Sequence, residues 1–263
     1  MSDADTVKPH LYLIDGSGYI FRAYHALPPM SRGDGTPVNA VYGFSNMLFK
    51  LLQDLADNEK PTHLAVIFDT PGKTFRSDFF PEYKATRQAP PTDLFEQKKH
   101  IVDFAERINL YQLSQSGIEA DDLMYSLAKK WHKNNGNVVV ITSDKDMGQM
   151  VDEKTVLFDT FKNIFVDTLF FEEKYGFLPN KASFYFSLVG DASDNIPGVK
   201  GIGKKGASEL VGQFDSLQDM YEKIEKIQKP RLKNALETYR DNAFLSEKLF
   251  LLREHPVLTE DKD

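Results

Sequence analysis

Short apolar runs alternate with amphipathic stretches along the first two thirds of the chain. The run Val138–Ile141 is continuous and β-branched, which is typical of a strand buried on both faces of a parallel sheet. Asn39–Asp57 instead repeats its apolar residues at helical spacing, which predicts an amphipathic helix. Further strands are predicted at 10–14, 64–68, 109–113, 156–158 and 164–166, and a further helix at 92–108. Asp15–Gly18, after the first of these strands, is predicted to be a turn. This alternation favours an α/β fold with a mostly parallel central sheet flanked by helices.

The pattern changes after about Thr168, where the strands stop and helical segments follow. One turn-rich stretch, Gly190–Gly206, interrupts these segments. We therefore expect an α/β core over residues 1–167 and a helical lobe over residues 168–263. The lobe is expected to pack against the core rather than to form a separate domain.

Residues 73–93 show neither the apolar pattern of a strand nor the apolar spacing of a helix. Basic residues are interleaved there with aromatic residues and prolines. Long irregular segments in compact domains are usually functional, so we interpret this one as a long, mobile, basic connection. The alternative is a solvated loop whose aromatic side chains pack down, and composition alone does not separate the two. The residues concerned are Lys73, Arg76, Lys84 and Arg87, with Phe75, Phe79, Phe80 and Tyr83.

Composition narrows the class of protein. The chain has 263 residues, of which 41% are hydrophobic, and it contains no cysteine. It is long enough to fold alone, and it lacks disulfides, thiolate metal ligands and cysteine nucleophiles, which fits a reducing compartment, with the cytoplasm as the default. Met1–Asp5 is polar and acidic, and no apolar run is long enough to span a bilayer, so we expect neither export nor membrane insertion.

A net charge of −7 argues against an anionic partner when it is taken over the whole chain. The argument weakens if the acids are concentrated in one cavity filled by metal ions. Bound cations would then invert the local field, and the surface that faces DNA could still be basic.

Seven carboxylates are predicted to meet at one edge of the sheet. The carboxyl ends of parallel strands line one crevice, and three of the predicted strands end in aspartates. Each acid alone is explained as a turn former or helix cap. Several clustered carboxylates, however, can all stay ionised only if cations offset their repulsion. Oxygen ligands favour Mg²⁺ or Mn²⁺, and ions roughly 4 Å apart can hydrolyse phosphodiesters. The acids are Asp15, Asp69, Asp144 and Asp146 after strands, and Glu119, Asp121 and Asp122 at a helix start.

The three acids at the helix start are not expected to be equivalent. Glu119 and Asp122 are three residues apart and can share a helix face. Asp121 then points elsewhere unless the first turn is irregular, and it is the acid whose direct metal contact is least expected.

The stretch Gly190–Gly206 adds two acids and a second kind of signal. Asp191 and Asp194 would share a face if the segment is helical. Several glycines then precede a new helix, where backbone amides can approach a phosphate, and lysines add positive charge. Residues 190–213 resemble a helix-hairpin-helix element; a tight helix connection with solvated lysines is the alternative.

Six motifs in this order resemble the 5′-nuclease or flap endonuclease family, in particular the N-terminal 5′→3′ exonuclease region of bacterial DNA polymerase I. The resemblance runs through nearly the whole chain. The motifs are Leu13–Gly16, Phe68-Asp69, Tyr83–Arg87, Gly117–Asp122, Ser143–Asp146 and Gly190–Gly203.

The resemblance implies roles for individual residues. Lys84 and Arg87 are implied to lie on an arch, about 73–93, and to steer the scissile phosphate. All nine acids are implied to bind two or more Mg²⁺ or Mn²⁺ ions, directly or through water: Asp15, Asp69, Glu119, Asp121, Asp122, Asp144, Asp146, Asp191 and Asp194. The implied DNA contacts are Arg22 and Tyr24 at the strand junction, Arg76 in the arch, and Lys200, Gly201, Gly203, Lys204 and Lys205 in the hairpin, whose carbonyls could also take up K⁺.

The function implied is a structure-specific 5′-nuclease of DNA replication and repair, cutting near 5′ ends or flap junctions. Two alternatives stay open, a metal-dependent ribonuclease with a similar core and a DNA-junction binding module with a decayed site. We expect a monomer that binds DNA. The polar tail Thr259–Asp263 suits a free-standing protein or a linker, so a polymerase partner stays open, in trans or as further domains.

Overall fold

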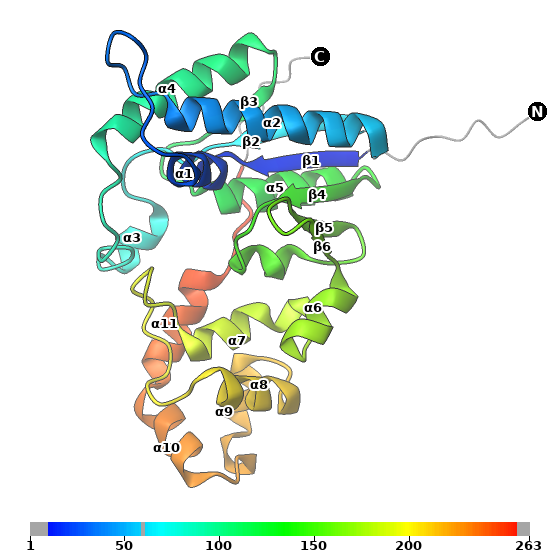
Figure 1. Ribbon diagram of the computed structural model, residues 1–263. Coiled ribbons are helices and arrows are strands. Elements are labelled where there is room, and N and C mark those ends of the chain that lie inside the picture. Colours follow the sequence, from blue (N-terminus) through cyan, green and yellow to red (C-terminus); the bar gives the residue numbers. More distant parts are fainter. Residues whose placement is uncertain (1–9, 59–60, 257–263) are drawn as a thin grey trace, which may run out of the picture.

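The computed structural model describes residues 10–58 and 61–256 and contains one six-stranded sheet (Figure 1). The strand order is β3-β2-β1-β4-β5-β6; strands β1 to β5 pair in parallel, and β6 pairs antiparallel with β5. The strands are β1 His10–Asp15, β2 His63–Ile67, β3 Tyr111–Leu113, β4 Asn137–Ile141, β5 Thr155–Asp159 and β6 Ile164–Val166. The predicted, mostly parallel sheet is therefore confirmed.

Helices cover both faces of this sheet. Side chains alternate along β1, so Tyr12 and Ile14 face one layer while Leu11 and Leu13 face the other. The first layer consists of α1 Gly16–Ala26, α2 Asn39–Asn58 and α4 Thr92–Arg107. The second layer consists of α5 Ala120–His132 and the 3₁₀ helix η1 Asp146–Met150. Both sheet faces are buried, which explains the continuous apolar strands.

The glycines after β1 belong to a helix, although the sequence predicts a turn there. Asp15 ends β1 and caps α1, because its Oδ1 accepts a hydrogen bond from the Gly18 amide at 2.8 Å. A Cβ at Gly16 would lie 2.5 Å from the Phe68 ring, so close packing requires glycine there. The carboxylate is thereby fixed at the sheet edge.

The lobe after residue 168 has a core of its own, rich in aromatic side chains, and it lies below the sheet in Figure 1. In the described part of the lobe all regular elements are helices, as the sequence predicts. They are α6 Thr168–Tyr175, η2 Pro179–Lys181, α7 Ala182–Val189, α8 Lys204–Gln213, α9 Leu217–Glu222, η3 Ile224–Lys226, α10 Pro230–Thr238 and α11 Arg240–Phe250.

Segment 73–93 is folded against the lobe. It contains the short helix α3 Phe75–Phe79, and Tyr83 is buried in the lobe core. The Lys84 amide donates to the Asp194 carbonyl at 2.9 Å, and Asn195 Nδ2 donates to the Glu82 carbonyl at 2.8 Å. The structure thus favours the reading in which an aromatic side chain of this segment packs down.

None of the helices between residues 10 and 256 that the structure describes is long and apolar enough to cross a membrane. The polar ends Met1–Asp5 and Thr259–Asp263 lie outside the described residues.

Candidate active site

Asp15 ends β1, the strand between β2 and β4, and lies at the carboxyl edge of the sheet where the crevice is predicted. Its second oxygen accepts a hydrogen bond from Thr142 Oγ1, at the end of β4, at 3.0 Å. Burial, together with the charges of Asp69 and Asp144, raises the pKa of Asp15 to about 6, although the Gly18 amide opposes the rise. Asp15 is therefore close to two other strand-end acids, as predicted.

Asp69 joins the next strand to the acidic helix. It follows β2, and its Oδ1 accepts the backbone N–H of Ala120, the first residue of α5, at 2.9 Å. Its backbone is held from two sides, because its N–H donates to Ser17 Oγ at 2.9 Å and Lys98 Nζ donates to its carbonyl at 2.6 Å. These bonds bring the start of α5 to the strand-end acids.

Asp121 is the acid of α5 that faces the crevice. Burial and then repulsion by Asp144, Asp15 and Asp69 raise its pKa well above the usual value. Asp121 therefore lies near these strand-end acids, as expected only for an irregular first turn. Glu119 precedes the helix with an extended backbone (φ −78°, ψ 152°), so helical spacing from Glu119 does not apply.

Glu119 lies in a pocket of hydrogen-bond donors. Its oxygens accept from Thr74 Oγ1 at 2.9 Å, Tyr83 Oη at 3.1 Å and Lys84 Nζ at 2.8 Å. Burial opposes ionisation of Glu119, but Lys84 and Arg76 outweigh it and lower its pKa. Lys84, in the arch segment 73–93, is thus held beside the strand-end acids by the ionised carboxylate of Glu119.

Asp122 and Arg76 are both buried, and they form an ion pair. Arg76 Nη1 and Nη2 donate to the two oxygens of Asp122 at 2.5 and 3.1 Å. This placement corrects one expectation, because Arg76 is in the interior and not on a DNA-facing surface. The Asp122 carboxylate is turned to Arg76.

Asp144 and Asp146 follow β4 and lie together. Asp144 Oδ1 accepts the Asp146 amide at 2.9 Å. Burial and the charge of Asp144 raise the pKa of Asp146 to about 7. Asp146 Oδ1 is buried, and no donor among the described residues serves it. That oxygen lacks the partner that a buried polar atom normally has.

Asp191 and Asp194 lie in a turn, not in a helix, because Asp191 forms an isolated bridge with Ile196. Each acid is paired with a cation from another segment. Lys145 Nζ donates to Asp191 Oδ2 at 2.8 Å, and Arg87 Nε donates to Asp194 Oδ1 at 2.7 Å. The lobe thus contributes two acids beside Asp146, whose pKa both of them raise.

The carboxylates fit divalent cations, although the side chains as placed do not enclose one. Within residues 10–58 and 61–256, no three His, Cys, Asp or Glu side chains are close enough to hold an ion. The raised pKa values of Asp15, Asp121 and Asp146 nevertheless record repulsion and burial that a cation would relieve. An all-oxygen donor set suits Mg²⁺ or Mn²⁺.

Arg22 and Tyr24 occupy different surroundings on α1. Arg22 Nη2 donates to Ser143 Oγ at 2.5 Å, beside Asp144, and its guanidinium lies 5.3 Å from the Phe161 ring centre. Tyr24 Oη donates to Asp93 Oδ1 at 3.0 Å, in the first turn of α4. Arg22 is therefore at the rim of the crevice, whereas Tyr24 is held by α4.

The glycine hairpin is exposed and leads into α8. Lys200, Gly201, Gly203, Lys204 and Lys205 all lie on the surface. Gly201 has φ +93°, a conformation that favours glycine, and Gly203 directly precedes α8. Backbone amides and lysines are thus both available at this helix start.

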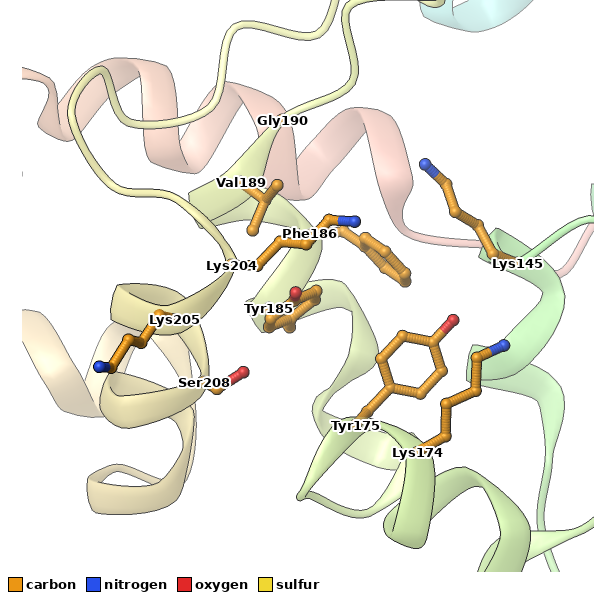
Figure 2. Close-up of a pocket in the computed structure, with 10 residues that line it drawn as sticks. All are labelled: Lys145, Lys174, Tyr175, Tyr185, Phe186, Val189, Gly190, Lys204, Lys205 and Ser208. Atoms are coloured by element: carbon orange, nitrogen blue, oxygen red, sulfur yellow. The ribbon is translucent and has the colours of Figure 1, made fainter.

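A basic cleft of about 510 Å³ lies between Lys145 and the start of α8 (Figure 2). Lys145, between Asp144 and Asp146, lies at one end of it, and Lys204 and Lys205 lie at the other. Tyr175, Tyr185 and Phe186 form apolar parts of its wall.

Three side chains of this region were not among the predicted site residues. Lys174 lines the cleft, Lys98 holds Asp69, and Tyr83 bonds to Glu119. Tyr83 could have been found from its place beside Lys84. No sequence signal separates Lys98 or Lys174 from other surface lysines.

The fold is shared with solved structures. A structure of T5 5′-exonuclease with bound zinc matches 92% of this chain and 89% of that chain, with TM-score 0.75 and 22% identity. The catalytic core of Rad2 in complex with DNA substrate matches 95% of this chain and 80% of that chain, with TM-score 0.61 and 16% identity.

Sequence relatives are nearer. DNA polymerase I of Rhizobium leguminosarum is 40% identical over 258 residues, which are 97% of this chain and 25% of that protein. A 5′-3′ exonuclease of Buchnera aphidicola subsp. Baizongia pistaciae is 38% identical over 247 residues, 92% of this chain and 80% of that protein. The chain thus spans about a quarter of the length of that polymerase and most of the length of that exonuclease.

Two family models together cover almost the whole chain. Residues 10–176 match the 5′-3′ exonuclease N-terminal resolvase-like domain, and residues 177–262 match the 5′-3′ exonuclease C-terminal SAM fold. With the carboxylate crevice and the fold, these matches confirm the resemblance read from the six motifs: the chain belongs to the 5′-3′ exonuclease family.

Proposed function

We propose that this chain is a structure-specific 5′-nuclease that hydrolyses DNA phosphodiesters near 5′ ends or flap junctions with the help of divalent cations. The observation that carries the proposal is the convergence of Asp15, Asp69, Asp121 and Asp144 on one edge of the sheet, where hydrogen bonds tie Asp15 to Thr142 and Asp69 to the start of α5. Relatives named 5′-3′ exonuclease, and structural neighbours solved with metal ions and DNA, support it.

Two or more Mg²⁺ ions, or Mn²⁺ in their place, would be held by these four acids and Glu119, with Asp146, Asp191 and Asp194 beside them. When bound, the ions supply positive charge against the phosphate and activate water for its hydrolysis. The chain itself holds the acids in place through the Gly18, Thr142 and Ala120 hydrogen bonds.

Lys84 is proposed to contact the scissile phosphate as a cation, not as a base. Burial opposes its charge, but Glu119 outweighs burial and raises the pKa of Lys84, so the amine stays protonated at neutral pH. Its Nζ is 2.8 Å from Glu119 Oε2 and thus beside the acids. Arg87, paired with Asp194, is proposed to act from the same arch.

DNA is proposed to run from the crevice along the basic cleft to the glycine hairpin. Lys145, Lys174, Lys204 and Lys205 supply the charge along this path, and Lys200, Gly201 and Gly203 complete its far end. Backbone amides and a helix start suit a phosphate without reading sequence. Carbonyls of the hairpin are proposed to take up K⁺, and Arg22 is proposed to meet the strand junction.

The division into a core of 1–167 and a lobe of 168–263, with the helix-hairpin-helix type element at 190–213, belongs to this proposal.

A 5′-labelled flap DNA incubated with the purified chain tests the proposal. We expect cleavage near the junction with Mg²⁺ and none with EDTA. An RNA version of the same flap that is cut faster would favour the ribonuclease, and tight flap binding in EDTA without turnover in any divalent ion would favour the decayed binding module.

We propose that the chain acts as a monomer, which the elution volume during the same purification checks. Adding a DNA polymerase to the flap assay tests a partner in trans.

A further inference from the structure

The Arg76 guanidinium joins three separate parts of the chain. It lies on α3, at the base of the arch segment, and its side chain is 3% exposed. Besides the two bonds to Asp122, Nε donates to the Leu249 carbonyl at 2.7 Å and Nη2 to the Leu251 carbonyl at 3.1 Å. All three nitrogens therefore donate to groups of α5 or of the chain end at and after α11.

Asp122 accepts hydrogen bonds from the same two parts of the chain, the arch base and the segment after α11. It is fully buried, and its Oδ1 also accepts the Arg253 amide at 2.8 Å. One turn further along α5, Ser126 Oγ donates to the Asp122 carbonyl at 2.6 Å and accepts the His255 amide at 2.9 Å. Residues 251–255 are thereby fastened along the first turns of α5.

These contacts adjoin the crevice without entering it. Arg76 Nη1 is 3.7 Å from Glu119 Oε2, so the guanidinium lies between Glu119 and Asp122. Asp121, the residue between those two, is the one that Asp144, Asp15 and Asp69 repel. The buried pair thus sits directly behind the turn of α5 that presents Glu119 and Asp121.

We propose that Asp122 and Arg76 are positioning residues that set the first turn of α5 and the base of the arch, and that Asp122 does not bind metal. The inference rests on the proposed nuclease function for its kinetic part only. A buried bidentate pair in which each guanidinium nitrogen donates a hydrogen bond holds its surroundings rigidly, and removal of one partner leaves an uncompensated buried charge. Substitution of either residue should therefore loosen the first turn of α5 and the base of the arch, which slows cleavage, while every metal-holding acid stays in place.

Direct binding of Mn²⁺, followed by calorimetry, separates positioning from ligation. We expect Asp122→Asn to bind as many Mn²⁺ ions as the unaltered chain, with Kd within about threefold, or ~0.7 kcal/mol. The neighbouring Asp121→Asn is the matched control, and it should lose an ion or bind at least about tenfold more weakly. Equal loss of Mn²⁺ binding by the two variants would overturn the proposal, whether or not the chain cleaves DNA.

A second variant guards against a single substitution that fails to fold. Arg76→Gln together with Asp122→Asn replaces the ion pair by a neutral hydrogen-bonded pair and removes both buried charges. Under the proposal the double variant melts higher than Asp122→Asn and cleaves flap DNA at least about threefold faster. A double variant that is no more stable and no more active than Asp122→Asn overturns the proposal, since a lost ligand cannot be restored from Arg76. If the unaltered chain leaves flap DNA uncut, the proposed function fails, and the Mn²⁺ and melting measurements still decide the positioning role.

Discussion

Single carboxylates in the crevice differ in what their loss should do. Asp144 is exposed, and its Oδ1 accepts the Asp146 amide. We expect Asp144→Asn to keep that bond through the amide oxygen and to lower turnover at least about 100-fold, or ~2.7 kcal/mol in activation free energy. Flap binding measured in Ca²⁺ should change less than about threefold. Equal weakening of binding and turnover would count against the proposed role.

Lys84 tests the cationic role of the arch. Lys84→Ala should lower turnover by about 10²–10³-fold, as expected when one preorganised charge is removed from a transition state. Glu119 keeps Thr74, Tyr83 and Arg76 as partners, so the melting temperature should change little. Lys84→Arg is the matched control and should recover part of the rate. A large drop in melting temperature for Lys84→Ala would instead show a structural role.

The raised pKa values predict a pH dependence of the metal-free protein. Asp15 and Asp146 have folded pKa values of about 6 and about 7, above the ordinary 3.8. A group with a raised pKa stabilises the fold below its unfolded pKa and loses that contribution as pH rises through its folded pKa. In EDTA, the melting temperature should fall between about pH 4 and pH 8, and Asp146→Asn should flatten the fall. Each kcal/mol is worth about 2–4 °C. Scanning calorimetry checks this, and a melting temperature that rises over this range contradicts it.

Among the elements, the loop between α7 and α8 depends on two glycines that pack backbone to backbone, Gly190 and Gly198. Gly190 has φ +72°, and a Cβ there would lie 2.6 Å from the Ile196 carbonyl oxygen. Gly190→Ala should therefore cost about 2 kcal/mol or more of unfolding free energy, by strain and by clash. Gly212 in α8 is the matched control, because a Cβ added there would meet no atom of the described residues within 4 Å. Gly212→Ala should be neutral or stabilise by up to ~1 kcal/mol in urea unfolding.

Element boundaries show where sequence reasoning works. Val138–Ile141 was predictable because strands buried on both faces are uniformly apolar. Helix α1 was missed because Gly16 and Gly18 read as a turn, whereas the Asp15 cap and the approach of Phe68 make them helical. Glycine required by a neighbour in space cannot be told from glycine required by a turn.

At the scale of the whole molecule, long-range pairing limits what the sequence can show. The sequence is enough to predict that the strand-end acids lie close together, because parallel topology places the ends of β1, β2 and β4 at one edge. The Arg76 pair could not be predicted in this way, because its acceptors are 46, 173 and 175 residues away. An arginine among aromatics is therefore predicted to be a surface contact, and nothing in the sequence marks Asp122 as its partner.

The basic cleft makes a prediction for the molecule as a DNA-binding surface. Lys174→Ala should weaken flap binding and reduce the salt slope of log K by about 1, without changing the melting temperature. Lys133, exposed directly after α5 and at the opposite end of that helix from Asp121, is the matched control and should leave both unchanged. Fluorescence anisotropy over a range of KCl concentrations measures the slope. An unchanged slope for Lys174→Ala would remove the cleft from the DNA path.

Two helices begin at the crevice, α1 directly after Asp15 and α5 directly after Glu119. The amino end of a helix carries a partial positive charge of roughly half a unit, so both dipoles point their positive ends at the clustered acids. The backbone thus already offsets part of the repulsion before any cation arrives. The chain should accordingly keep its native circular dichroism spectrum in EDTA at neutral pH, with metal needed for chemistry and not for folding.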